Sequence, residues 1–242
     1  MNIFTPVISV KIRMTEKRYI FESAINSFHY LYQDAYYLLS NAKLKHIKGT
    51  FKEVRLARSA FLLFILSIEG LVNRALDHFL PSTLHDFVLE KEDKFSTIDK
   101  WRMLALLSGA HEKDLDFGVY PWSHLNELIK VRNDYVHPKH DRMAYYEYTS
   151  PQQFKHLQWN KIPKGMKIKE KDVVYGQTKT PKDPYGFKVE HLEKVQKVVD
   201  DVVNEMDKIL GGKLTEKNWA RGDQMTLCYP LGAKIDDLAK KS

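Results

Sequence analysis

The 242-residue sequence contains a single cysteine, Cys228. One cysteine excludes an intramolecular disulfide and any zinc centre built from several cysteines. A chain without disulfides suits the reducing cytosol. The sequence therefore argues against a disulfide scaffold and against a cysteine-rich metal protein.

Long apolar runs are also missing. The longest extends from Ala60 to Ile68 and contains Ser67, whereas a membrane-spanning helix needs about 20 apolar residues. The opening stretch, MNIFTPVISVKIRMTEKR, lacks the apolar core of a signal peptide. We therefore expect a cytoplasmic protein that does not cross a membrane.

Positive charge is concentrated in one stretch. Residues 151–188 contain nine lysines, no arginines and three acids, and so carry six of the seven net positive charges. A local excess of lysine attracts polyanions such as RNA, because binding releases the counterions of the phosphates. The same composition is also typical of a solvated loop. Both interpretations stay open at this point.

Helical spacing of apolar residues covers most of the chain. It predicts helices over Lys17–Asn41 and Lys52–Leu80, then over residues 95–109 and 121–138, and finally over Val189–Leu210. The second of these is apolar on nearly every side, which is typical of a helix in the centre of a bundle.

Capping residues set the expected ends of two of these helices. Ser96 or Thr97 would begin the third helix, and Ser123 the fourth. Gly109 would end the third, and Pro138 would end the fourth at or before the residue that precedes it.

These patterns predict an all-α bundle of four to five helices, interrupted by one basic insertion. We expect the helical core in residues 1–141, the insertion in 142–187, a closing helix in 188–212 and an irregular tail in 213–242. The insertion is either irregular or forms short strands, for which the candidates are residues 145–150, 154–159 and 171–178.

The stretch VRNDYVHPKH, residues 131–140, places Arg132, Asn133 and His137 near a helix end. RNA can be cleaved by its own 2′-hydroxyl, which needs only alignment and proton transfer. A histidine can move that proton, and an arginine can contact the phosphate. One histidine cannot be base and acid at once, whereas two copies facing each other across a twofold axis could supply both groups.

Glu69 and Asn73 lie four residues apart on the most apolar predicted helix, and therefore on one face of it. A carboxylate in such a helix needs a partner, and we expect that partner to be Arg132. Glu69 and Asn73 would then either orient Arg132 for function or simply satisfy each other between packed helices.

Arginine, asparagine and a histidine after four intervening residues resemble the signature of the HEPN superfamily. The resemblance includes SIEGLVN upstream and covers roughly Lys17–Lys139, with Val189–Leu210 as a closing helix. It implies a HEPN-like bundle and a metal-independent endoribonuclease without a cofactor. It further implies a homodimer with the site at the dimer cleft, and a setting in stress response or defence.

One position departs from that family. In toxin–antitoxin pairs of this kind, a tyrosine two residues after the histidine is modified, whereas this chain has Lys139. Lys139 therefore argues against regulation by nucleotidylation of this position. It does not affect the predicted cleavage chemistry. No particular antitoxin or other protein partner is predicted.

The functional prediction is an endoribonuclease for single-stranded RNA that leaves a 2′,3′-cyclic phosphate, with His137 as acid and base, Arg132 on the phosphate and Asn133 and Glu69 as positioning residues. The alternative is a non-catalytic HEPN-like module that binds RNA, a nucleotide or a protein. No metal site is expected, and His124 is expected at the surface. Further RNA contacts are assigned to Lys139, His140, Lys155, Trp159, Lys164 and Lys167.

Overall fold

The computed structural model describes residues 19–24, 27–81, 88, 91, 94–111, 115–137, 169–216 and 224–230. The chain divides into two compact units, one formed by Asn26–Arg221 and one by Met1–Ile25 together with Gly222–Ser242. The first unit is helical and contains the predicted motif. The prediction of a largely helical protein is therefore confirmed in the described residues.

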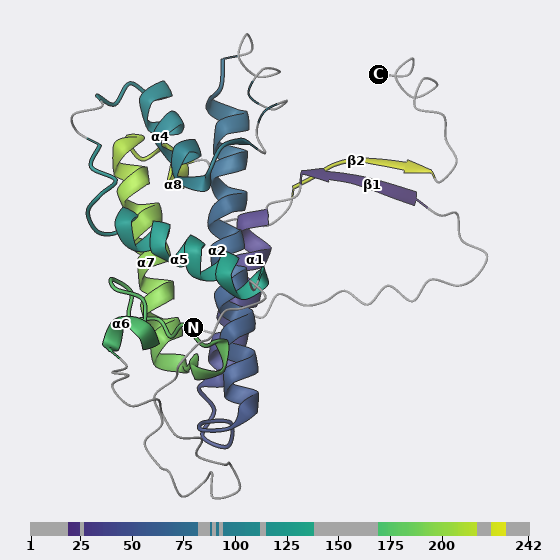
Figure 1. Ribbon diagram of the computed structural model, residues 1–242. Coiled ribbons are helices and arrows are strands. Elements are labelled where there is room, and N and C mark those ends of the chain that lie inside the picture. Colours follow the sequence, from purple (N-terminus) through teal and green to yellow (C-terminus); the bar gives the residue numbers. More distant parts are fainter. Residues whose placement is uncertain are drawn as a thin grey trace, which may run out of the picture. The chain divides into compact units, whose positions relative to one another are not determined.

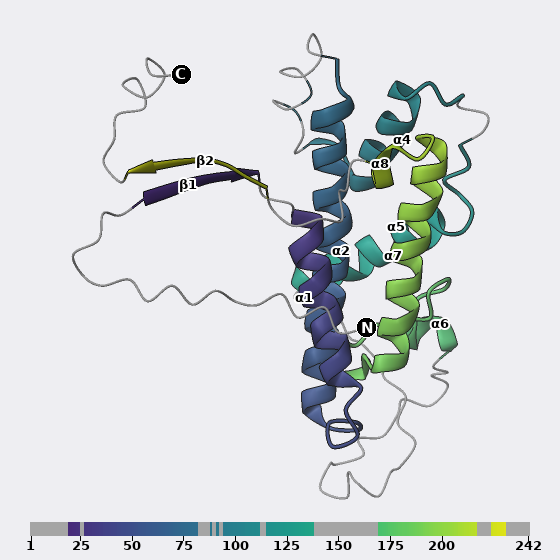
Figure 2. The ribbon, with the colours of Figure 1, turned by 180° about the vertical axis from the view of Figure 1, so that it is seen from behind.

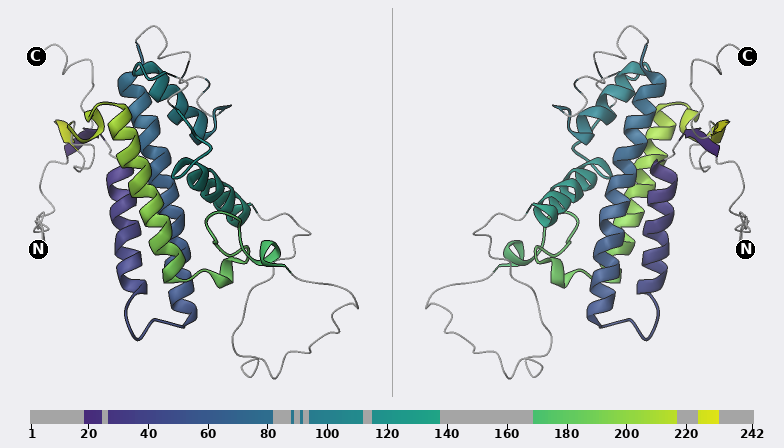
Figure 3. Two further views of the ribbon diagram at one scale, coloured as in Figure 1. Left: turned by 90° about the vertical axis from the view of Figure 1, so that its left-hand side faces the viewer. Right: turned by 90° about the vertical axis from the view of Figure 1, so that its right-hand side faces the viewer.

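Three long helices form the centre of the helical unit. Helices α1 (Ser27–Ala42), α2 (Phe51–Phe79) and α7 (Val189–Ile209) lie side by side (Figures 1 and 3). A short turn joins α1 to α2, so these two run antiparallel, as the view from behind also shows (Figure 2). Because α2 contacts α1, α4, α5 and α7, it is the central helix that its apolar sequence predicted.

Close contact between α1 and α2 depends on Gly70. A Cβ atom built at this position would lie 2.9 Å from the Cβ of Ser27, which is too short for two carbon atoms. Only glycine lets the first turn of α1 approach α2 this closely.

A buried carboxylate joins the starts of α2 and α7. Glu53 is 5% exposed, and its carboxylate accepts hydrogen bonds from the backbone N–H groups of Gly49 and Val189. Thr50 caps α2 by accepting from the Glu53 N–H group. Two helix beginnings, whose N–H groups have no partner inside the helix, are thus satisfied at one end of the bundle.

Two shorter helices complete the bundle. α4 (Thr97–Leu107) begins after Ser96, whose hydroxyl accepts from the Asp99 N–H group, so the predicted cap is present. α5 (Trp122–Val136) follows Pro121 without a side-chain cap, so the predicted cap at Ser123 is wrong. The helix ends one residue before His137, in agreement with the stop expected from Pro138.

The segment before α7 packs onto the bundle. The four-residue helix α6 (Glu170–Val173) leads into a bridge between Val174 and Pro181, so the strand expected over residues 171–178 is wrong. A 3₁₀ turn, η4 (Pro184–Gly186), then precedes α7. Tyr175 and Phe187, which belong to this segment, are buried in the main core.

The other unit contains an antiparallel pair of strands, β1 (Tyr19–Ala24) and β2 (Gln224–Pro230), with a bulge between Glu22 and Ser23. The helix predicted from Lys17 therefore begins only at Ser27. The tail predicted to be irregular contains β2 and the one-turn helix α8 (Lys213–Glu216). The two strands were missed because strand pairing across about 200 residues leaves no local periodicity.

Length and composition alone would let α2 cross a membrane. Half of its most apolar window is buried against the rest of the chain, however. That burial is compatible with the core helix of a soluble protein.

Candidate functional site

Arg132 reaches from α5 to α2, where its Nη2 atom forms an ion pair with Oε1 of Glu69. This is the partner that the sequence predicted for the carboxylate. Both side chains are 21% exposed, so the pair is largely shielded from water while an edge remains accessible. Partial burial strengthens the attraction between the charges relative to a fully hydrated pair.

α4 supplies a further donor to the same carboxylate. The hydroxyl of Thr97 donates to Oε1 of Glu69 over 3.2 Å. Glu69 therefore connects three helices: its own, α4 through Thr97 and α5 through Arg132. Glu69, which Thr97 holds in place, in turn fixes the side chain of Arg132.

Asn73 has a different partner from the one expected. Its side-chain oxygen accepts a hydrogen bond of 2.9 Å from Nζ of Lys100 on α4. Asn73 thus fixes α4 against α2 and makes no hydrogen bond with Glu69 or Arg132 among the described residues. We correct the prediction accordingly, since Glu69 and Thr97, and not Asn73, hold the arginine.

The ion pair with Glu69 uses only part of the guanidinium group of Arg132. It carries five N–H groups, and Nη2 is the atom that reaches Glu69. The Nε atom is buried and has no hydrogen-bond partner in the described part of the chain. Because Nε is buried, an incoming phosphate could reach only the exposed fifth of the Arg132 side chain.

In contrast to the partly buried Arg132, His137 is exposed at the end of α5. Its backbone leaves the helix, with φ −120° and ψ 67°, while its N–H group donates to the Asn133 carbonyl over 2.8 Å. Asn133 is exposed one turn earlier on the same side of the helix. The helix therefore ends in a residue with non-helical backbone at His137.

Within the described residues, no hydrogen bond or ion pair links Arg132 to His137. Arg132 faces α2, whereas His137 faces solvent beyond the helix end. Substrate or a second copy of the chain would have to bring the two groups to one phosphate.

The segment before α7 supports the last turns of α5. The hydroxyl of Tyr175 donates to the Asp134 carboxylate over 2.5 Å, and that of Tyr135 donates to the Pro181 carbonyl over 2.5 Å. Asp134 and Tyr135 stand between Arg132 and His137 in sequence. These bonds therefore fix the backbone that carries both motif residues.

Closer to the start of α5, Glu127 holds the turn at residues 176–180. Burial raises the pKa of its carboxyl group, but hydrogen bonds from the backbone N–H groups of Thr178 and Gln177 outweigh this and lower the pKa overall. Residues 175–181 are thus joined to α5 in its first half as well as in its last turns.

The additional RNA-contacting residues named from the sequence lie outside the described residues. They are Lys139, His140, Lys155, Trp159, Lys164 and Lys167. Among the residues that the structure does describe, no three His, Cys, Asp or Glu side chains gather where they could hold a metal ion.

His124 does not lie on open surface as expected. It is half-buried in the wall of a pocket that also includes Tyr120 and residues of the 176–180 turn. No sequence pattern indicates this pocket, because its walls come from segments about 50 residues or more apart.

No family model, curated protein or solved structure matches this chain.

Proposed function

We propose that this protein is a HEPN-like, metal-independent endoribonuclease that cleaves single-stranded RNA as a homodimer. The observation that carries the proposal is the ion pair between Arg132 and Glu69. It holds a partly exposed arginine five residues before an exposed histidine. The order of Glu69 on the central helix and the motif late in α5 also fits the HEPN resemblance.

In the proposed reaction, the 2′-hydroxyl of RNA attacks the adjacent phosphorus. The new bond joins O2′ to phosphorus, and the bond from phosphorus to O5′ breaks. His137 of one subunit takes the proton from the 2′-hydroxyl, and the protonated His137 of the partner subunit gives a proton to O5′. The products are a 2′,3′-cyclic phosphate and a 5′-hydroxyl.

Arg132 would stabilise this reaction by contacting a non-bridging phosphate oxygen, where negative charge grows in the transition state. Glu69 and Thr97 keep the guanidinium group in place, so less ordering is needed when RNA binds. Asn133, next to His137 on the helix surface, would orient the imidazole or the RNA.

Two copies are needed because one imidazole cannot act on both sides of phosphorus. The absence of a contact between Arg132 and His137 within the described part of one chain is consistent with this requirement. The burial of half of α2's apolar window and the lack of disulfides fit a soluble cytoplasmic enzyme. A role in stress response or defence rests on the resemblance alone.

The test is cleavage of a labelled single-stranded RNA in EDTA by the wild type and by Arg132→Ala and His137→Ala. Arg55→Ala and His46→Ala serve as controls, because both residues are exposed elsewhere on the bundle. We expect loss of cleavage in the first pair alone. Equal cleavage by all five proteins would overturn the proposal and favour a non-catalytic module that binds RNA, a nucleotide or a protein.

A further inference from the structure

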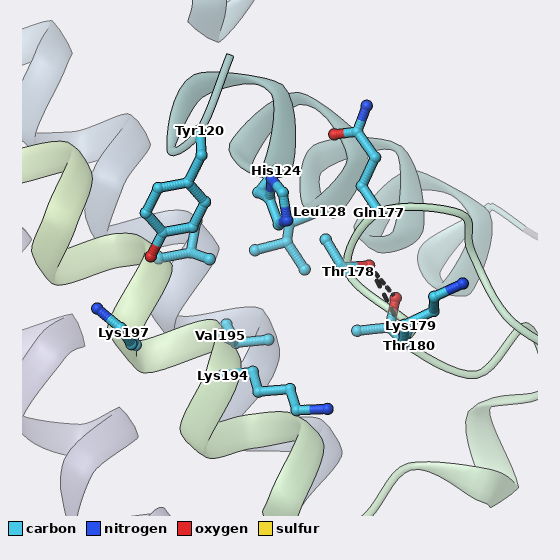
Figure 4. A pocket seen from close by; sticks show the side chains of 11 residues that line it. Tyr120, His124, Leu128, Gln177, Thr178, Lys179, Thr180, Lys194, Val195 and Lys197 are labelled. Carbon is cyan, nitrogen blue, oxygen red and sulfur yellow. Dashed lines mark hydrogen bonds between the residues drawn. The ribbon is translucent and has the colours of Figure 1, made fainter.

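A pocket of about 380 Å³ lies between α5, the 176–180 turn and α7 (Figure 4). This volume falls within the range of about 300–1,000 Å³ that is usual for small-molecule sites. The pocket is lined by Tyr120, His124, Leu128, Gln177, Thr178, Lys179, Thr180, Lys194, Val195, Lys197 and Val198.

The interior of the pocket is apolar. Leu128, Val195 and Val198 are buried beneath it. The hydroxyls of Thr178 and Thr180 hydrogen-bond to each other over 2.8 Å, which leaves the turn with less capacity to bind water. The rings of Tyr120 and His124 meet edge to face at 4.9 Å and form the facing wall. A ligand body that fills this space would therefore be apolar.

The pocket rim is positively charged, and most of that charge is already matched. Lys197 forms an ion pair of 2.7 Å with Asp201, to which the Tyr120 hydroxyl also donates. Lys179 forms one of 3.0 Å with Glu170.

Lys194 is the exception among these lysines. It is exposed at the rim, and the described residues give it neither an ion pair nor a hydrogen bond. One positive charge beside an apolar pocket is therefore uncompensated, which favours a ligand with one negative charge.

We propose that this pocket binds a small organic anion, with its apolar body over Val195 and Leu128 and its charged group against Lys194. The pocket lies toward the start of α5, whereas the proposed ribonuclease motif lies at its end. His124 precedes His137 by 13 residues, about 20 Å at a helical rise of about 1.5 Å per residue, and Leu128 precedes Arg132 by one turn. Binding to the pocket is measured directly and needs no RNA.

The experiment uses two fluorescent probes that share their aromatic rings. 8-Anilinonaphthalene-1-sulfonate carries a negative charge, and N-phenyl-1-naphthylamine is neutral. We expect the full-length protein to bind one molecule of either probe and to bind the anion more tightly. Lys194→Gln should weaken anion binding about fivefold, as expected for an exposed ion pair, and leave the neutral probe unaffected.

Two further variants locate the binding. His124→Trp replaces a side chain that projects into the pocket (Figure 4) with a larger one, and should abolish binding of both probes. Lys208→Gln changes another exposed lysine of α7, outside the pocket lining, and should alter neither. Circular dichroism establishes that each variant is folded.

Two results would overturn the proposal. Unchanged anion binding by Lys194→Gln would refute recognition of the charge. Unchanged binding by a folded His124→Trp would place the probes elsewhere on the protein. If His124→Trp does not fold, the comparison of the two probes on Lys194→Gln still decides, since that position is exposed.

Discussion

Arg132 on α5 is ion-paired with Glu69 on α2, and the same carboxylate oxygen accepts a hydrogen bond from Thr97 on α4. One carboxylate therefore determines where the arginine lies. The pair joins helices that are far apart in sequence, so it contributes to packing as well as to the proposed chemistry.

Glu69→Gln keeps the size of the side chain and removes its charge. Because Arg132 would then be partly buried without a counter-ion, we expect the free energy of unfolding to fall by about 2 kcal/mol. RNA cleavage should fall at least about tenfold, since the guanidinium group is no longer fixed. Urea denaturation and the cleavage assay measure the two effects.

Glu205→Gln is the matched control, because that carboxylate is 43% exposed and pairs with Lys208 on the surface. It should change neither quantity. If Glu69→Gln lost stability but cleaved RNA at the wild-type rate, Glu69 would be a packing residue only.

Tyr175→Phe removes the hydrogen bond to Asp134 and leaves the buried ring in place. We expect a loss of about 1 kcal/mol in the free energy of unfolding, typical of one hydrogen bond. Tyr185→Phe, at a ring that is 65% exposed, should have no measurable effect in the same urea titration. Equal stability of both variants would show that the Tyr175 hydroxyl does not support α5.

Gly70→Ala tests the close packing of α1 on α2. The added Cβ would lie 2.9 Å from the Cβ of Ser27, and overpacking of this kind costs about 1–3 kcal/mol. Ser27→Gly removes the opposing atom, so the double variant should be more stable than the sum of the single effects predicts. Strict additivity in thermal unfolding would argue against a direct clash.

Glu127→Gln should produce a pH-dependent loss of stability. The pKa of Glu127 lies below its ordinary value of 4.5, so folding favours the ionised carboxylate. That contribution is fully present above pH 4.5 and disappears as pH falls through the lowered pKa. The difference in unfolding free energy between wild type and variant should therefore be largest near about pH 7 and shrink in acid. A difference that is constant with pH would contradict this account.

The local features of the helical unit were predictable from the sequence. Apolar spacing located α2 and α7 to within one residue at each end, because both helices bury a continuous face. The N-cap of α4 at Ser96 and the end of α5 before Pro138 were also predictable, because capping depends only on neighbouring residues. The Glu69–Arg132 pair followed from the need of a carboxylate in an apolar helix for a counter-ion.

Long-range features were not predictable in this way. β1 pairs with β2 through backbone hydrogen bonds. The spacing of side chains along the sequence does not show which strands pair in this way. The partner of Asn73 proved to be Lys100, because the rotation of α4 against α2 decides which donor comes near. The pocket beside His124 requires the docking of the 176–180 turn, which depends on backbone N–H groups that bind Glu127.

The most direct test of the central claim is the chemistry of the cleaved RNA ends. Wild type should generate a 2′,3′-cyclic phosphate and a 5′-hydroxyl in EDTA, and a single 2′-deoxy substitution should block cleavage at that nucleotide. His137→Ala should give no product, whereas His46→Ala should cleave normally. Products that carry a 5′-phosphate, or undiminished cleavage by His137→Ala, would contradict the proposal that this protein is a ribonuclease that uses the RNA's own 2′-hydroxyl.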